Sequence, residues 1–256
     1  MSGTINENLY VVRSHPADKT EQEFESSLER RGLYLLCKRV FDVLISSLTI
    51  IFILSWLLPI LAILIRLDSR GPAFFVQRRV GFLGKSFFCI KLRTMIVNAV
   101  CDHQQATSND PRITRLGKFL RITSLDELPQ FFNVLIGDMS IVGPRPHMLR
   151  DNEDFGSVVS NYRFRLYVKP GITGIAQLKG CRGPAKNFHS IFHRYQWDAF
   201  YIRNANIALD FKIIRLTAIQ IFRSMFFFKS AKGQNEPGLV RETSGWALAK
   251  SASSGE

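Results

Sequence analysis

The sequence predicts a mixed α/β fold that is mainly helical and carries an apolar, proline-broken helix near the N-terminus. Three observations support this prediction. Residues 43–65 contain no charged side chain. Residues 73–77 and 86–91 alternate in polarity as strands do, with Gly81 and Gly84 marking a turn between them. From Leu116 onward, and again over 128–136, apolar residues recur at helical spacing.

Composition narrows the choice of partners. The chain has 256 residues, a net charge of +13 and a pI near 9.9, so phosphates, nucleic acid or acidic lipid are the expected partners. Charge alone leaves these three open. The cysteines are scattered, with no Cys-x-x-Cys pair, which argues against a zinc site or a disulfide framework: Cys37, Cys89, Cys101 and Cys181.

The apolar run allows two membrane geometries. As a straight helix its 23 residues would reach about 35 Å, enough to span a bilayer core of about 30 Å. Pro59, however, lies inside the run and would clash with the carbonyl of Ser55, whose lost partner the Ser55 hydroxyl or a water could replace. Basic residues, which mark the cytoplasmic side, flank both ends: Arg30, Arg31, Lys38, Arg39, Arg66, Arg70, Arg78 and Arg79. We therefore favour a re-entrant helix over a spanning one.

These observations divide the chain into four parts. Residues 1–32 form a polar, flexible segment that does not resemble a signal peptide, and 33–68 form the re-entrant membrane helix. Residues 69–231 form a mixed α/β domain, and 232–256 form a disordered tail. Within the domain, residues 211–228 predict a basic, aromatic-rich helix, suited either to the lipid headgroup boundary or to the core.

The central chemical candidate is the segment 124–129. Pro129 is tolerated only in the first turn of a helix, so a helix should begin close to Asp126. An alternative interpretation is purely structural, because Ser124 and Glu127 have the spacing of a capping box. Clustered cations upstream favour chemistry on a phosphate: Arg112, Arg115, Lys118 and Arg121. In that interpretation Asp126 attacks phosphorus, while Asp126 and Glu127 hold Mg²⁺.

A second candidate is Arg145, which lies between Pro144 and Pro146. The residue before a proline is extended, so this guanidinium is presented from a stiff backbone that suits a fixed anion. The alternative is an ordinary rigid turn with a solvated arginine. Lys169 begins a further glycine-containing turn that carries a cation, which is weak evidence by itself.

Seven strings, in order along the chain, make the sequence resemble the bacterial sugar transferase family. They are KRVFD (38–42), IKLRTM (90–95), SLDELPQ (124–130), NVL (133–135), GDMS (137–140), VGPRP (142–146) and KPGITG (169–174). The resemblance covers about residues 33–220. The chain resembles the minimal form of these monotopic phosphoglycosyl transferases, without the multi-spanning region of longer relatives.

The resemblance implies both a function and a site. The function is transfer of a sugar-1-phosphate from a UDP-sugar to undecaprenyl (polyprenyl) phosphate, through a phosphosugar–aspartate intermediate and with Mg²⁺, as the initiating step of exopolysaccharide, capsule, O-antigen or glycoconjugate synthesis. The implied location is the cytoplasmic face of the bacterial inner membrane, where a small catalytic domain with interfacial amphipathic helices follows the re-entrant helix. The implied catalytic dyad is Asp126 and Glu127, and the implied substrate-binding residues are Lys91, Arg112, Arg121 and Arg145. One departure is that Ser55 and Pro59 do not form the family's frequent Ser-Pro pair.

Three other functions are weighed against this one. A nucleic-acid-binding protein would leave the apolar run unexplained, and no signature of that class appears. A non-catalytic scaffold of a polysaccharide assembly complex would tolerate loss of Asp126. A glycosyltransferase that moves the sugar alone would release UDP rather than UMP. The sequence does not identify the sugar, and it leaves a homo-oligomer open.

Overall fold

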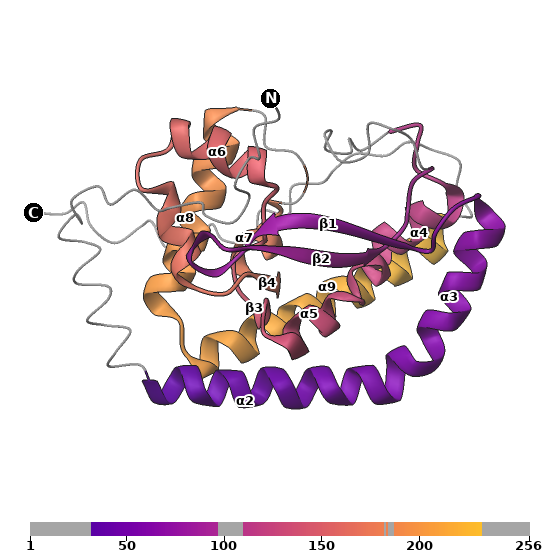
Figure 1. The fold of residues 1–256 in the computed structure, drawn as a ribbon, viewed down its shortest axis with the longest axis horizontal. Helices are drawn as coiled ribbons and strands as arrows, with labels where there is room; N and C mark the ends of the chain where they lie inside the picture. Colours follow the sequence, from indigo (N-terminus) through magenta and orange to yellow (C-terminus); the bar gives the residue numbers. More distant parts are fainter. Residues whose placement is uncertain (1–31, 97–109, 182, 184–186, 232–256) are drawn as a thin grey trace, which may run out of the picture.

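A computed structural model describes residues 32–96, 110–181, 183 and 187–231 (Figure 1). The expected flexible segment 1–32 and tail 232–256 lie, except for Gly32, outside the described residues. The mixed α/β, mainly helical fold is confirmed. The helices surround two small sheets of two strands each.

A bent apolar helix runs along one side of the molecule. It consists of α2 (Gly32–Thr49), a π-helical turn η1 (Ile50–Leu54) and α3 (Ser55–Asp68). In Figure 1 α2 runs along the bottom and α3 turns upward at its right-hand end. Among the described residues, this is the one helix whose length and composition would let it cross a membrane.

The sequence indicated a break near Pro59, but the helix is already irregular from Ile50 onward, upstream of Ser55. Pro59 has no N–H to offer the carbonyl of Ser55, and the ladder is already widened over η1, a turn type that commonly bends helices. Of the two replacements that the sequence left open for that lost partner, the Ser55 hydroxyl and a water, the hydroxyl is excluded. It donates instead to the carbonyl of Ile51, at 2.6 Å. The indole N–H of Trp56 reaches the carbonyl of Phe52 at 2.8 Å.

The two strands expected around the glycine turn form an antiparallel hairpin. Strand β1 (Phe74–Val80) pairs with β2 (Ser86–Leu92) through the turn η2 (Phe82–Gly84). The first strand begins just after the expected start at 73 and continues beyond 77, and the second ends one residue beyond 91. Helix α4 (Arg115–Thr123) packs against the end of the hairpin. It can approach that closely because Gly117 lies against the backbone of Thr94, where a Cβ atom would overlap the carbonyl.

The second sheet is parallel and very short. Strands β3 (Ser140–Val142) and β4 (Gly171–Thr173) meet where Gly143 lies against the backbone of residues 169–171, without room for a side chain. The helix α5 (Gln130–Ile136) leads into β3. The remaining elements gather at the other end of the hairpin: α6 (Leu149–Val158), η4 (Tyr162–Tyr167), α7 (Ile175–Leu178) and α8 (Phe188–Asn204).

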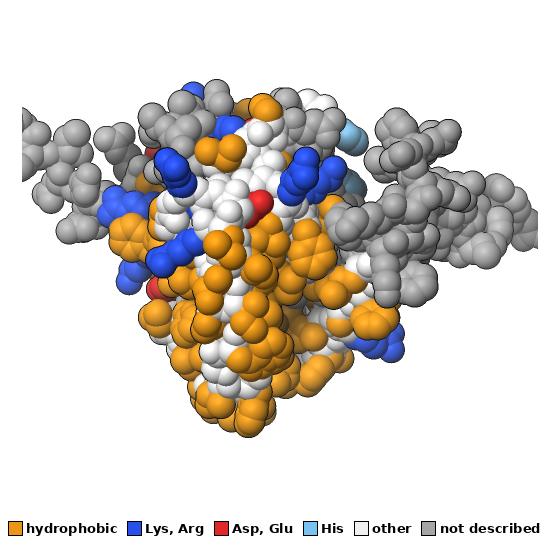
Figure 2. Space-filling view, turned by 90° about the vertical axis from the view of Figure 1, so that its right-hand side faces the viewer, with side chains coloured by type: hydrophobic (Ala, Val, Ile, Leu, Met, Phe, Trp, Pro, Cys, Tyr) orange, Lys and Arg blue, Asp and Glu red, His pale blue; other side chains and the backbone are white. Residues whose placement is uncertain are grey.

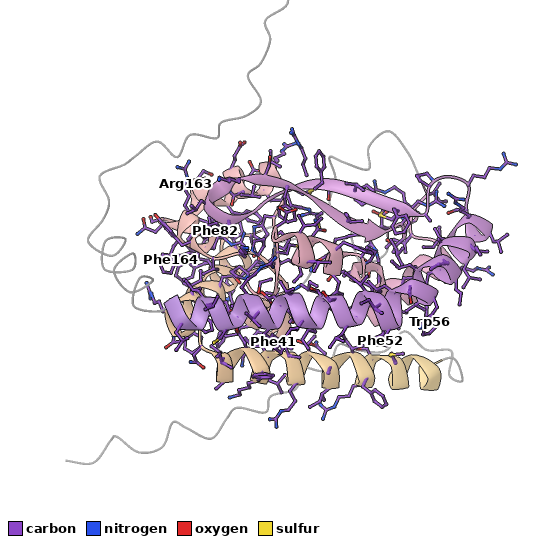
Figure 3. The ribbon with its side chains drawn as sticks, turned by 60° about the horizontal axis from the view of Figure 1, so that its bottom comes forward. Phe41, Phe52, Trp56, Phe82, Arg163 and Phe164 are labelled. Atoms are coloured by element: carbon purple, nitrogen blue, oxygen red, sulfur yellow. The ribbon has the colours of Figure 1, made fainter. Side chains whose placement is uncertain are left out.

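The last described helix, α9 (Ile207–Ala231), includes the range 211–228 predicted to be helical. It lies beside α2, with Phe41 and Phe211 in edge-to-face contact at 5.1 Å between ring centroids (Figure 3). Ile213 is buried in the main core, whereas Phe211 and Phe222 are exposed. One side of α9 therefore packs on the core, as one interpretation of this segment expected, while its exposed apolar side chains leave the headgroup interpretation a prediction.

Among the described residues, three apolar clusters hold these elements together, and the smallest joins α6, η4 and α8 through Phe155, Tyr162 and Ile191. The main core lies between the hairpin, α5, α8 and α9. A second core joins α3 to α4 and the end of the hairpin, and it includes Leu54, Leu61, Ile65 and Leu120. The bent helix is thus fastened to the domain at both ends while much of its surface stays exposed.

Candidate active site

The two candidate carboxylates stand on a tight turn between α4 and α5. Ser124 adopts a left-handed conformation with φ of 58°, and a single 3-10 turn, η3 (Leu125–Glu127), follows it. The capping-box alternative is wrong, because the Ser124 side chain makes no capping hydrogen bond and α5 begins only at Gln130, after Pro129. The reversal at Ser124 places Asp126 and Glu127 beside strand β2 rather than inside the first turn of a helix.

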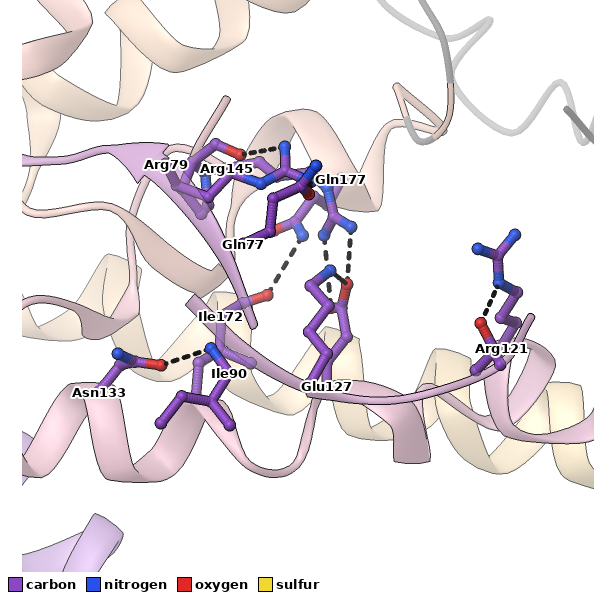
Figure 4. Close-up of polar contacts among 12 residues, drawn as sticks. Gln77, Arg79, Ile90, Arg121, Glu127, Asn133, Arg145, Ile172 and Gln177 are labelled. Atoms are coloured by element: carbon purple, nitrogen blue, oxygen red, sulfur yellow. Dashed lines mark hydrogen bonds and ion pairs between the residues drawn. The ribbon is translucent and has the colours of Figure 1, made fainter. Parts of the chain in front are cut away.

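Glu127 lies between two cations from distant parts of the chain (Figure 4). Its Oε1 atom is 2.9 Å from the Lys91 ammonium and 2.6 Å from Nη2 of Arg145, and its Oε2 atom accepts from Nη1 of Arg145 at 3.3 Å. Burial alone would raise the pKa of Glu127. Arg145 and Lys91 outweigh that effect and hold the pKa well below its usual range, so this carboxylate is ionised.

Asp126, its neighbour, has the opposite shift. Burial, and then the negative charge of Glu127, raise the pKa of Asp126 to about 6, although Lys91, Arg121 and Arg145 all oppose the rise. Two adjacent carboxyl groups thus titrate far apart, an arrangement that is typical of functional sites. Asp126 is therefore mostly ionised at neutral pH, although its carboxylate is poorly solvated.

Arg121 is close enough to Asp126 for the two charges to interact, and Arg112 interacts electrostatically with Arg121. The guanidinium of Arg121 donates to Oγ1 of Thr94 at 2.9 Å and to Sδ of Met95 at 3.4 Å. Arg112 forms an ion pair of 2.6 Å with Asp110 and lies near Arg121. The structure therefore brings Lys91, Glu127 and Arg145 into direct contact around Asp126, whereas Arg112 stands further out.

The loop that presents Arg145 is held rigidly from behind. The backbone carbonyl of Arg145 accepts a hydrogen bond of 2.6 Å from Arg165. Arg165 also forms a buried ion pair of 3.1 Å with Asp198. The guanidinium of Arg79 contacts the carbonyl of Pro146 at 3.4 Å. Together with the close approach at Gly143, these contacts fix the backbone from which Arg145 reaches Glu127.

Some residues of the sequence strings have supporting positions that the sequence did not reveal. Arg93 donates to the carbonyls of Ser69 and Arg70, at 2.5 and 2.7 Å, and so closes the C-terminal end of α3. Asn133 accepts from the N–H of Ile90 and donates to the carbonyl of Phe88, which binds α5 to the hairpin (Figure 4). In the sequence, Arg93 and Asn133 were visible only as polar residues within apolar stretches, and the fold was needed to show their partners.

The dyad meets the requirements of a Mg²⁺ ligand pair in charge and in atom type. Mg²⁺ prefers carboxylate oxygens, and it commonly binds one or two of them together with substrate phosphates and water. Glu127 is already balanced by Lys91 and Arg145, whereas Asp126 carries a negative charge that burial disfavours. A divalent cation beside Asp126 would relieve that cost, so these residues fit the ion.

A partly buried carboxylate pair near guanidinium groups, in a domain that carries a bent apolar helix, is suited to phosphate chemistry at a membrane surface. Residues 33–224 match the family model described as bacterial sugar transferase, and the chain belongs to that family.

Three relatives show the range of the match. The "UDP-glucose:undecaprenyl-phosphate glucose-1-phosphate transferase" of Klebsiella pneumoniae is 47% identical over 200 residues, 78% of this chain and 42% of the relative. A protein of the same name from Caulobacter vibrioides is 41% identical over 83% of this chain and 82% of its own length. The "Exopolysaccharide production protein PSS" of Rhizobium leguminosarum bv. phaseoli is 41% identical over 72% of this chain and 94% of its own length. The chain spans less than half the length of the Klebsiella relative.

Proposed function

We propose that this protein transfers a sugar-1-phosphate from a UDP-sugar to polyprenyl phosphate, the initiating step in the synthesis of an exopolysaccharide or a related glycan. The observation that carries the proposal is the juxtaposition of Asp126 with the Lys91–Glu127–Arg145 ion cluster. The names of the Klebsiella and Caulobacter relatives support the same donor and acceptor classes. Which sugar is carried remains for experiment.

The first step is attack on phosphorus by a carboxylate oxygen of Asp126. A new bond forms between this oxygen and the sugar-linked phosphorus of the donor, and the bond from that phosphorus to the bridging oxygen breaks, so UMP leaves. Arg121 and Arg145 both lie close enough to lower the pKa of Asp126, so they can offset the charge of the phosphoryl oxygens. Glu127 keeps Arg145 and Lys91 in place.

In the second step the polyprenyl phosphate takes over the phosphosugar. One of its oxygens attacks the same phosphorus, the acyl phosphate bond between Asp126 and phosphorus breaks, and polyprenyl-diphosphate-sugar is formed with Asp126 restored as a carboxylate. When bound by Asp126 and Glu127, Mg²⁺ would supply additional positive charge against the transferring phosphate.

The bent helix accounts for how a lipid substrate meets this carboxylate. Figure 2 shows an apolar wedge at one end of the molecule, with Lys and Arg side chains above it. Its exposed residues include Ile51, Phe52, Trp56, Ile60 and Ile63. A re-entrant insertion of this wedge from the cytoplasmic face of the inner membrane would hold Asp126 at headgroup depth, because the basic residues favour the phosphates of that layer.

Product analysis tests the proposal. Purified protein in detergent, with Mg²⁺, undecaprenyl phosphate and a panel of UDP-sugars that includes UDP-glucose, is expected to release UMP. Release of UDP would instead show transfer of the sugar alone, and no release with any donor would favour a scaffold.

The nucleophile is tested separately by mass spectrometry of the protein incubated with donor alone. An adduct of sugar phosphate is expected on Asp126. Asp126→Asn should abolish the adduct and lower turnover by roughly 10³-fold or more. An adduct that persists in this variant would show that another residue attacks.

A further inference from the structure

Two side chains of α2, one helical turn apart, are bonded to the two segments that carry the active site. The first is Arg39. Its Nη1 and Nη2 atoms donate to the carbonyls of Val134 and Leu135, at 2.7 and 2.9 Å. These carbonyls belong to the last turn of α5, where backbone acceptors lack a partner within the helix. Arg39 thus holds the far end of the helix that follows the Asp126–Glu127 turn.

The second is Asp42, whose carboxylate is only 3% exposed. Its Oδ1 atom accepts a hydrogen bond of 3.0 Å from the backbone N–H of Ile141, in the middle of β3. Four residues later the same segment presents Arg145. A buried carboxylate is costly unless hydrogen-bonded, so its use at this point in an apolar helix requires an explanation.

We propose that Arg39 and Asp42 are positioning residues that set the angle between α5 and β3, and thereby the placement of Glu127 against Arg145. Helix α5 and strand β3 are joined by a short turn at residues 137–139. Asp126 and Glu127 lie just before the start of α5, and Arg145 lies just after the end of β3, so all three are remote from that turn. A small rotation at the turn would therefore be amplified at the site. This inference rests on the proposed function, since the consequence is for catalysis.

Attachment of α2 to the domain does not by itself account for these two contacts. A separate group already fastens α2 to α9: the Lys38–Asp210 ion pair at 2.9 Å, the hydrogen bond from Tyr34 to Asp210 at 3.0 Å, and the ring contact of Phe41 with Phe211. Arg39 and Asp42 add bonds to the two segments whose relative position determines the site. Misplacement of reacting groups by about 1 Å can cost about 100-fold in rate.

A double-mutant cycle distinguishes positioning from general stability. Asp42→Ala removes the oxygen that accepts from the Ile141 N–H. Asp42→Asn keeps an acceptor oxygen in a side chain of the same shape. Each is combined with Arg145→Lys, which keeps the charge but loses the paired contact with Glu127. Lys38→Met is the matched control, because it breaks an α2 ion pair with α9 rather than with α5 or β3. All variants are assayed as the full chain, below the melting temperature of the least stable one.

We expect Asp42→Ala to lower kcat for UMP release by about 10- to 100-fold in the wild-type background, with a much smaller change in KM. With Arg145→Lys the same change should cost less than about 3-fold, because the pair it positions is already broken. Asp42→Asn should restore kcat to near the wild-type value. Lys38→Met should have the same small effect in both backgrounds. Arg39→Met is expected to behave like Asp42→Ala.

Equal losses from Asp42→Ala in both backgrounds, or no loss in either, would overturn the inference. So would an Asp42→Asn variant as impaired as Asp42→Ala. The proposed function is judged separately, by whether the wild-type protein releases UMP at all.

Discussion

At the scale of single residues, the site depends on the different charge states of two neighbouring carboxyl groups. In the described part of the chain, Glu127 forms ion pairs with two cations, Lys91 and Arg145, while Asp126 interacts with both electrostatically without an ion pair to either. The first arrangement makes a stable anion that organises the site, and the second leaves a carboxylate with a raised pKa and therefore greater basicity. In the proposed mechanism, attack and support are in this way divided between adjacent residues.

Activity should therefore fall on the acid side of neutrality. Attack requires the ionised form of Asp126, whose pKa is about 6. Below that pH, kcat/KM for the donor should fall about tenfold per pH unit. The measurement is UMP release from pH 5 to 8 at constant ionic strength and constant Mg²⁺. A profile that stays flat down to pH 5 would contradict the assigned nucleophile.

At the scale of secondary structure elements, the bend between α2 and α3 decides where the N-terminal end of the helix lies. The wide turn over Ile50–Leu54 and the missing N–H of Pro59 both weaken the backbone ladder at this point. Without the bend, the 37 residues of Gly32–Asp68 would form a helix of about 55 Å, long enough to span a bilayer.

The variant Ser55→Ala/Pro59→Leu should straighten this helix and convert a re-entrant segment into a spanning one. Cys37, which is exposed near the start of α2, reports the change. In spheroplasts of cells whose protein lacks Cys101 and Cys181, a membrane-impermeant maleimide should label Cys37 in the variant and not in the parent. Labelling of the parent would show that the native helix already spans the membrane.

The contact between α4 and the hairpin should be sensitive to a single methyl group added at Gly117. Gly117→Ala would place a Cβ atom on the carbonyl of Thr94 and is expected to destabilise the protein by about 3 kcal/mol. It should also reduce activity, because Arg121 leaves the same helix to meet Thr94. Thermal unfolding measures the first effect and UMP release the second.

Gly156→Ala is the matched control for that change. Gly156 lies in α6, is exposed, and has nothing within 4 Å of an added Cβ. Replacement there should leave stability unchanged or raise it by up to about 1 kcal/mol, because alanine favours the helix. Equal destabilisation by both variants would contradict the close approach assigned to Gly117.

At the scale of the whole molecule, the apolar wedge and the active site belong to one rigid unit. α3 shares a core with α4, and α2 is bonded to α5, β3 and α9. A bilayer that receives the wedge would therefore fix the depth of Asp126 as well. The large exposed apolar area is uncommon for a soluble monomer and indicates a lipid or protein interface.

Charges placed at the elbow of the wedge should weaken membrane binding without unfolding the domain. Phe52 and Trp56 are 68% and 56% exposed, and both are labelled at the elbow in Figure 3. We expect Phe52→Lys/Trp56→Lys to lower co-flotation with liposomes by at least about 10-fold, given the cost of lysine in the bilayer core. Val158→Lys, at an apolar position that is 44% exposed on α6, should float like the wild type.

Much of this protein could be predicted from local pattern. The apolar run, the hairpin and the helices around Leu116 and Pro129 each leave a periodic or steric signal within a few residues of themselves. The residues that meet at the site also lie in recognisable strings. Local pattern could not show that Ser124 reverses the chain, that the break begins at Ile50 rather than near Pro59, or that Arg93 closes α3, because those outcomes depend on packing between segments far apart in sequence.

The amino-acid sequence by itself therefore determined the class of fold, the apolar helix and the identity of the candidate dyad. Tertiary structure alone decided the division of labour between Asp126 and Glu127, because a pKa depends on burial and on charges brought in from other elements. It also decided that Arg39 and Asp42 face α5 and β3, 95 and 99 residues further along the chain. Such contacts exist only after folding, and no spacing along the sequence encodes them.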